Sequence, residues 1–327
     1  MVRGCPTEKE IRKHKLEIVF QEQFKIGSED FYPVQEVIML AQIVLTPVES
    51  KKLISKAIAK LDVVRQAALE GMVVLHPSSS TYFIVEEITG TKPKTNYWVC
   101  GVVTPKGMCV EMAMVLGADY TPKNMTSDPG DLRACWIIKN GKLAAEEKLS
   151  ELLNRMTPMD VYIKGVNALD PQGHVGVLVG HPGSMGYILS AWRKRKFNLI
   201  YPVGLEKLIP VPIVQTARKA KPAKYGYAMG MPTGLFPCPA GKTVNELDAI
   251  AILSGATAIP IAAGGLGGAE GAITIVIEGD DDQVNKAIEY VEQSKGARFP
   301  QLRLCNCNDC PVPHCTFPVR DKHWALP

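Results

Sequence analysis

The chain has 327 residues, of which 46% are hydrophobic and 21% are charged, a composition typical of a folded protein with a real core. The formal net charge of +4 is too small to indicate a nucleic-acid-binding protein, and no uninterrupted apolar run reaches membrane-spanning length. Residues 1–20 carry scattered charges and lack the apolar core of a signal peptide, so we expect a cytoplasmic protein without nucleic-acid or membrane partners.

The first part of the chain is predicted to hold short strands and one long amphipathic helix. Residues 1–45 contain apolar runs without a helical period, which we interpret as strands and connections that cover an edge. From Pro47 to Ala68, apolar residues recur every three or four positions, and Gly71 follows, which predicts a helix ending at this glycine. The β-branched run Met72–Leu75 then predicts a buried parallel strand.

Strands and helices alternate from there to about residue 204. The pattern predicts a helix over 81–88 with Ser79 or Ser80 as its N-cap, two strands about a Pro-Lys-Gly turn over 97–116, a strand before Asn140-Gly141, a helix over 149–156, a second strand-loop unit over 159–192 and a buried strand over 198–204. This alternation favours an α/β fold with a mostly parallel sheet and flanking helices.

The C-terminal third changes in character. Residues 221–241 are rich in Gly and Pro and form either a linker or an ordered functional loop; their length favours the loop. Thr243 and Glu246 predict a capping box for a helix that ends at Gly255, and two strands and a second helix follow. This order predicts a small α+β subdomain of ferredoxin-like type. The predicted division is an α/β domain (1–220), a Gly/Pro-rich loop (221–241), an α+β subdomain (242–298) and a Cys-rich tail (299–327).

The loop after Met72–Leu75 is predicted to bind an anion. It contains His76, Ser78, Ser79, Ser80 and Thr81, and it leads from a strand into a helix. Such a loop places backbone N–H groups and the positive end of the helix at the carboxyl edge of the sheet, where α/β proteins bind ligands. The alternative is a well-capped helix whose hydroxyls serve only the backbone.

A second loop, "VLVGHPGSMG", repeats the His-Pro-x-Ser pattern with His181, Gly183 and Ser184. If the two preceding strands are parallel neighbours, His76 and His181 approach one site from two sides. The alternative is coincidence, because His-Pro is a common loop dipeptide.

The segment "EGMVVLHPSSSTYFIVEEI", with the helix before it, resembles the first unit of the superfamily that holds ribose-phosphate isomerase, glucosamine-phosphate deaminase and the CoA transferases. In that superfamily a Ser/Thr loop grips phosphate. The segment over residues 159–210 resembles its second strand-loop-strand unit, and "GLEKLIP" is similar to the Gly-x-Glu-Lys end of lactate-utilisation domains. The resemblance covers about residues 48–215 through short motifs, and it implies an isomerase/CoA-transferase-like α/β domain.

The resemblance also implies roles for single residues. Ser78 to Thr81 would bind the anion, Lys164, Asn167 and Asp170 occupy the second motif, and Gly183 with Ser184 occupies the second loop. Glu206 and Lys207 would close the site. This chain departs from the family in its His-Pro loop start and in lacking a clean acidic cluster and a CoA-transferase glutamate motif. The fold is therefore better supported than any one reaction.

If the protein is an enzyme, Asp170 or Glu206 is the predicted general base. Lys164 or Lys207 would then stabilise an enolate or oxyanion. The alternative for each of the four is a solvated surface position.

The tail, "CNCNDCPVPHC", supplies Cys305, Cys307, Cys310, Cys315 and His314, which are soft ligands suited to zinc or an iron–sulfur cluster. The spacing matches no standard zinc ribbon or ferredoxin, and free thiols or a disulfide are the alternatives.

The sequence thus predicts an enzyme, an isomerase or a transferase, for a small anionic metabolite such as a phosphosugar or an acyl-CoA or organic acid, and we expect a homo-oligomer. The alternatives are a non-catalytic ligand-sensing protein on the same fold and a metal- or redox-responsive regulatory protein.

Overall fold

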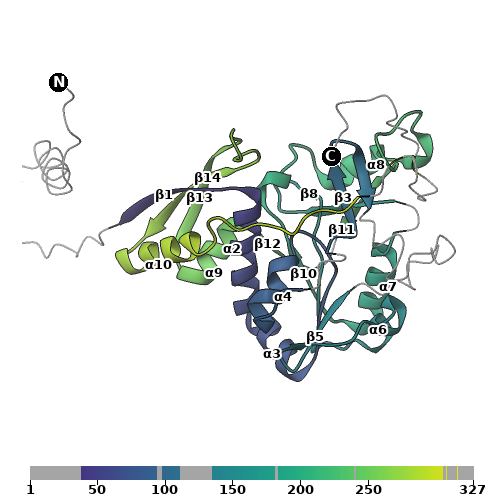
Figure 1. Ribbon diagram of the computed structural model, residues 1–327, viewed down its shortest axis with the longest axis horizontal. Helices are drawn as coiled ribbons and strands as arrows, with labels where there is room; N and C mark the ends of the chain where they lie inside the picture. Colours follow the sequence, from purple (N-terminus) through teal and green to yellow (C-terminus); the bar gives the residue numbers. More distant parts are fainter. Residues whose placement is uncertain are drawn as a thin grey trace, which may run out of the picture. The chain divides into compact units, whose positions relative to one another are not determined.

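The computed structural model in Figure 1 describes residues 38–93, 98–110, 135–180, 183–238 and 241–304, together with Cys307 and Cys315. The described elements form a mixed α/β structure with eight α-helices and four sheets. They belong to one unit, Ile38–Pro327. Within these residues, no helix combines the length and apolar character needed to cross a membrane.

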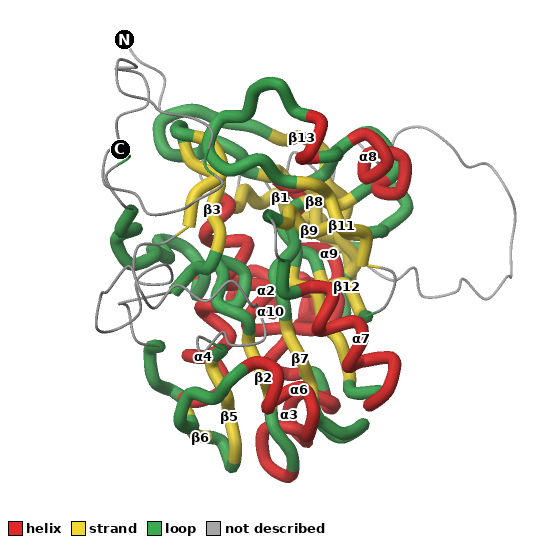
Figure 2. The backbone as a smooth tube through the Cα atoms, turned by 90° about the vertical axis from the view of Figure 1, so that its right-hand side faces the viewer, coloured by secondary structure: helices red, strands yellow, loops and turns green. Residues whose placement is uncertain are grey.

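A six-stranded mixed sheet is the centre of the fold, in the order β12-β10-β7-β2-β5-β6. Its four parallel strands are β12 (Lys242–Val244), β10 (Asn198–Pro202), β7 (Val161–Ile163) and β2 (Val73–Leu75). The hairpin of β5 (Trp136–Lys139) and β6 (Lys142–Leu143) extends it by antiparallel pairing. Figure 2 shows β5, β2 and β7 side by side. The predicted parallel core is confirmed, with an antiparallel edge added.

Helices cover both faces of this sheet, because its strands are apolar on both sides. Leu75, Ile163 and Ile200 face a core built with α2 (Pro47–Lys60), α3 (Asp62–Glu70), α4 (Tyr82–Thr89) and α9 (Glu246–Ser254). The alternate residues Tyr162 and Leu199 face a second core with α6 (Leu149–Arg155) and α7 (Met185–Arg195).

The long helix predicted from Pro47 is divided in two. Leu61 has extended backbone angles and separates α2 from α3, and Gly71 follows α3 as predicted. The division lets α2 pack against α4 and α9 while α3 packs against β5. The prediction of one continuous helix was wrong, because the apolar stripe continues through a bend that tertiary packing decides.

A three-stranded antiparallel sheet contains β8 (Ala168–Leu169), β9 (Val175–Val179) and β11 (Gly234–Cys238), and α8 (Ile213–Lys219) packs on β11. The Gly/Pro-rich segment thus holds an ordered strand, after the short 3₁₀ turn η4 (Pro222–Lys224). The predicted two strands about the Pro-Lys-Gly turn are β3 (Gly101–Thr104) and β4 (Gly107–Val110). Met108 of β4 exchanges backbone hydrogen bonds with Met229 and Met231, so this hairpin packs on the segment before β11.

The last sheet has the order β1-β14-β13 and is antiparallel, with β1 (Met39–Leu45), β14 (Ile273–Gly279) and β13 (Thr257–Ala263). Its buried face packs against α9 and α10 (Asp281–Glu292). The predicted helix-strand-strand-helix order is confirmed, but β1 joins from outside residues 242–298. The capping box of α9 is Asn245 with Asp248, not Thr243 with Glu246, because Thr243 lies in β12.

Candidate functional site

Three segments of the chain meet at the carboxyl edge of the parallel strands. β2 leads into the loop 76–81, β7 into Lys164, and β10 into the 3₁₀ turn η3 (Leu205–Lys207). Because parallel strands end at the same edge of a sheet, these segments are neighbours although they are far apart in sequence. The Lys207 ammonium confirms this: its Nζ donates to Ser80 Oγ at 3.2 Å and to the Val166 carbonyl at 2.7 Å.

Three hydroxyl groups of the loop make hydrogen bonds within the protein, and one, that of Ser79, has no partner among the described residues. Thr81 Oγ1 donates to the His76 carbonyl at 2.6 Å and lies 3.0 Å from Ser78 Oγ, which fixes the turn. Ser80 accepts from Lys207. Within the described residues, Ser79 Oγ and the N–H groups of Ser79 and Ser80 make no hydrogen bond. The loop therefore combines a rigid frame with three free donors.

The predicted N-cap is shifted by one or two residues. Thr81, and not Ser79 or Ser80, is the N-cap residue of α4, and its side chain makes no capping bond because its hydroxyl is used by His76. The structure thus leaves the first turn of α4 without a side-chain cap, next to the free donors.

Gly165 allows the loop to approach β7 closely. A Cβ atom at this position would lie 2.5 Å from Ser78 Oγ and 3.4 Å from the Cβ of Ser80. Ser78 and Ser80 are thereby seated against the residue that follows Lys164.

A network of charged side chains lies beside the loop. The sequence analysis predicted only some of its members. Glu206, a predicted residue, pairs with Lys51 of α2 at 2.5 Å, and Lys51 also donates to the Pro47 carbonyl. Glu246 of α9 is fully buried and accepts the Leu205 N–H with both oxygens. Lys51 and Glu246 were missed, because each lies on a different helix and only the tertiary structure brings it to η3.

The burial and the charges of this network bring the pKa values of two of its side chains close to neutrality. Burial, and then the Lys51 cation, lower the pKa of Lys207 to about 8, against the opposing charges of Glu206 and Glu246. Burial, and secondarily the Glu206 charge, raise the pKa of Glu246 to about 7. Glu206 Oε2 is buried and has no hydrogen-bond partner in the described part of the chain.

Four polar side chains form a row across neighbouring strands at the same edge. Leu75 pairs with Ile163 and Ile163 with Ile200, so the next residues, His76, Lys164 and Tyr201, stand side by side. On the other side, the antiparallel pairing of Leu75 with Trp136 places Cys135 next to His76.

Within this row, His76 Nδ1 lies 3.0 Å from the Tyr162 hydroxyl and 3.9 Å from Cys135 Sγ. Burial, and then the Lys164 cation, hold the pKa of His76 well below its usual value, so its imidazole is neutral. Burial raises the pKa of the Cys135 thiol to about 11, so the thiol stays protonated. Burial lowers the pKa of Lys164, whose ammonium makes no hydrogen bond or ion pair with the described residues.

Asp170 and Asn167 have contacts of a structural kind. The Asp170 carboxylate accepts the N–H groups of Gln172, His174 and Ile213 at 2.9–3.0 Å and contacts the His174 ring, and these contacts lower its pKa against the effect of burial. Asn167 Oδ1 accepts the Leu178 N–H. Both side chains tie down the β8–β9 hairpin, so Asp170 is a weaker candidate for the general base than Glu206.

The second loop does not follow a neighbour of β2. β9 pairs antiparallel with β8 and β11 in a separate sheet, so the expectation of parallel neighbouring strands was wrong. Gly183 and Ser184 precede α7, with Ser184 as an N-cap that makes no side-chain capping bond. His181 lies outside the described residues.

The predicted metal ligands fall mostly outside the described residues: Cys305, Cys310 and His314 are not described. Cys307 and Cys315 are free thiols, and among the described residues no cluster of three metal-binding side chains occurs. Burial, and then the thiols of Cys307 and Cys315, raise the pKa of Cys109 in β4, while a hydrogen bond with Thr104 opposes them. Cys307 and Cys315 thus lie near Cys109 of the β3–β4 hairpin, and the metal site stays a prediction.

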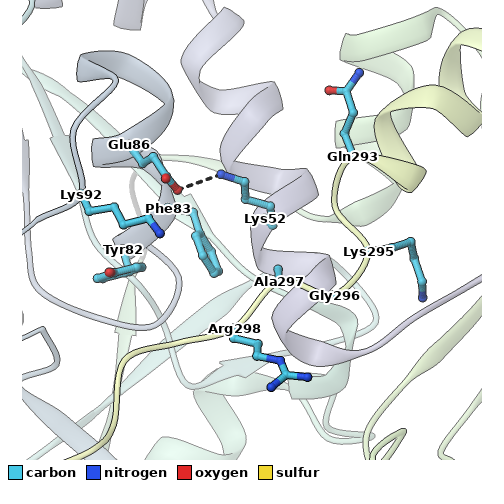
Figure 3. A pocket seen from close by; sticks show the side chains of 10 residues that line it. All are labelled: Lys52, Tyr82, Phe83, Glu86, Lys92, Gln293, Lys295, Gly296, Ala297 and Arg298. Carbon is cyan, nitrogen blue, oxygen red and sulfur yellow. Dashed lines mark hydrogen bonds and ion pairs between the residues drawn. The ribbon is translucent and has the colours of Figure 1, made fainter.

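A separate surface pocket of about 340 Å³ lies between α2, α4 and the segment after α10 (Figure 3). Its lining includes Lys52, which pairs with Glu86 at 3.0 Å, and Lys295, which pairs with Glu49 at 2.7 Å. Its lining includes no residue of the loop 76–81, of η3 or of the row that contains Lys164, and Lys52 and Lys295 already have partners.

Comparison with known proteins found no matching family model, no matching curated protein and no matching solved structure.

Proposed function

We propose that the protein is an enzyme that binds a small anionic metabolite at the carboxyl edge of β2, β7 and β10. The observation that carries this proposal is the hydrogen bond from Lys207 to Ser80, which brings a cation from η3 onto the hydroxyl loop. Ser79 Oγ, two free backbone N–H groups and the start of α4 offer donors to an anion, and Lys207 offers positive charge.

The catalytic roles follow from the charges around η3. Lys207, with a pKa of about 8, stabilises negative charge that develops on the substrate. Glu206 is the candidate base, because Lys51 holds one of its oxygens and the other has no hydrogen-bond partner in the described residues. Glu246, with a pKa of about 7, can take up or release a proton near neutrality.

The isomerase/CoA-transferase-like fold is part of the same proposal. It is supported by the order of helix, strand, Ser/Thr loop and helix from α3 to α4, at the edge of a sheet with four parallel strands. The antiparallel sheet of β8, β9 and β11 is a departure from the strand-loop-strand unit that the resemblance implies. The substrate class that we propose, a phosphosugar or an organic acid, rests on the Ser/Thr loop and on the family that it resembles.

Inorganic phosphate tests the anion site directly. Phosphate should raise the melting temperature of the wild-type protein, and Ser79→Ala and Lys207→Met should each remove most of that rise. Ser79 has no internal bond within the described residues, so its substitution should leave the unliganded protein as stable as before. Lys224→Met, which removes an exposed lysine of η4, is the matched control for charge.

An unchanged phosphate effect in both site variants would contradict the proposal. If phosphate binding needs Ser79, turnover separates an enzyme from a sensor. Glu206→Gln should abolish turnover of a phosphosugar or organic acid while phosphate still binds.

A further inference from the structure

The antiparallel sheet of β1, β14 and β13 is covered by helices on one face. Ile43 of β1 and Ile275 and Ile277 of β14 face the core that α9 and α10 complete, and Figure 1 shows these two helices on the same side of the sheet. Side chains alternate between the two faces along a strand, so the residues between these point away from the helices. We call the surface that they form the outer face.

The strand register determines which side chains share the outer face, because directly paired residues of antiparallel strands stand side by side on it. Its pairs include Leu40 with Glu278, Val276 with Ile259, and Val44 with Thr274. Leu40, Val44 and Ile259 have 64%, 44% and 57% of their surface exposed. Three large aliphatic side chains on the two flanking strands therefore face water in the described structure, and Val276 of the middle strand lies between them.

The outer face is apolar and almost uncharged. Of the residues that the register places on it, Glu278 alone carries a charge, and it lies at one end of the sheet beside Leu40. Ile261, at the bulge between Pro260 and Ala262, adds a side chain that is 54% exposed. Three seven-residue strands form a face of about 24 Å by 14 Å, or about 340 Å². Apolar patches of about 300–600 Å² are often interaction sites.

We propose that the outer face binds the same face of a second copy of this chain and forms a two-fold symmetric dimer. A neutral apolar surface has no charge with which to select a charged partner, and it is complementary to itself. Two sheets stacked about 10 Å apart would interdigitate their aliphatic side chains, as in a β-sandwich. The two faces together belong to the lower class of specific interfaces, below about 1,200 Å², so we expect the dimer to dissociate on dilution.

The single carboxylate of the outer face decides how the two copies are oriented. Glu278 and Thr274 lie at opposite ends of this face on β14, about 14 Å apart along the strand. A two-fold axis that crosses the strands at Val276 reverses the strand direction, so Glu278 of each copy lies over the Thr274 end of the other. An axis along the strands would instead place the two carboxylates face to face, which repulsion disfavours. The axis across the strands also sets Ile259 opposite its equivalent in the second copy.

Sedimentation velocity of the full chain over a dilution series tests the dimer. The wild type should sediment as a dimer at high concentration. Ile259→Glu should raise the dissociation constant at least about a hundredfold, because two carboxylates would then face each other in an apolar interface. Leu69→Glu is the matched control, since Leu69 on α3 is 65% exposed and lies outside the sheet, and it should leave the dissociation constant unchanged. Both positions are exposed, so each variant should keep the wild-type urea midpoint when monomeric.

A mixture of two variants identifies the partner surface. Ile259→Lys should also be monomeric, and mixing it with Ile259→Glu should restore a dimer through the opposite charges. A mixture that stays monomeric overturns the two-fold arrangement. A wild type that is monomeric at every concentration overturns the dimer itself and assigns the outer face to another part of the chain or to a different protein. Unchanged association of Ile259→Glu overturns the choice of surface. The dimer is independent of the anion site, so the phosphate-induced rise in melting temperature should persist in Ile259→Glu.

Discussion

The ion pair between Lys51 and Glu206 ties α2 to the carboxyl edge, and breaking it from one side should be far more harmful than removing it. Both side chains are largely buried, with 7% and 14% exposed, and Nζ lies 2.5 Å from Oε1. Lys51→Met leaves a buried carboxylate, and Glu206→Gln leaves a buried ammonium. The double variant leaves neither.

The expected size follows from the geometry. At an effective dielectric constant of about 20, unit charges 2.5 Å apart attract by about 7 kcal/mol. Removing each ion from water costs several kcal/mol, which offsets most of that attraction. Each single substitution should therefore lower the free energy of unfolding by about 3–5 kcal/mol, because it leaves the other charge uncompensated. The double variant should lose less than the sum, with a coupling energy of about 2 kcal/mol.

Urea unfolding at pH 7, followed by tryptophan fluorescence, measures these differences from the midpoint and the slope. Arg65→Met is the control, because Arg65 and Asp62 on α3 lie 3.8 Å apart with exposed side chains; it should cause no measurable change. Additive losses in the double variant would refute the reasoning. As a second readout, Lys51→Met should raise the pKa of Lys207 above about 8, since the Lys51 cation lowers it.

Gly165→Ala should lower the free energy of unfolding by about 1–3 kcal/mol and weaken phosphate binding, because its Cβ would meet Ser78 Oγ at 2.5 Å; unchanged binding would show that Ser78 can move freely. Thr81→Val should cost about 1–3 kcal/mol in urea unfolding through the lost bond to the His76 carbonyl, whereas Ser79→Ala should not. Glu246 has a pKa raised from 4.5 to about 7, so its protonated form stabilises the fold, and that stability is lost as pH rises from about 4.5 to 7. Glu246→Gln should remove about 3 kcal/mol of this pH dependence; equal slopes for variant and wild type would contradict the assignment.

Much of the local structure follows from the sequence alone. Period-three and period-four stripes predict α9, α10 and the helical stretch that holds α2 and α3, and the β-branched run between Gly71 and Pro77 predicts β2. These signals are local, since a helix or a buried strand needs only its own residues to show which face is apolar. The hydroxyl loop was recognisable for the same reason, as a short run at the end of a strand, whereas Glu206 and Lys207 were predicted from the resemblance of "GLEKLIP" to a known family.

The tertiary structure alone decides which of these runs meet. β9 has the pattern of a buried strand, yet it joins a separate antiparallel sheet, and β1 pairs with β14, more than two hundred residues later. The row of His76, Lys164 and Tyr201 depends on the register of three strands. Lys51 and Glu246 reach the site from two helices. Strand pairing and helix packing depend on how the whole core is buried. The residues that they bring together therefore show no common local pattern in the sequence.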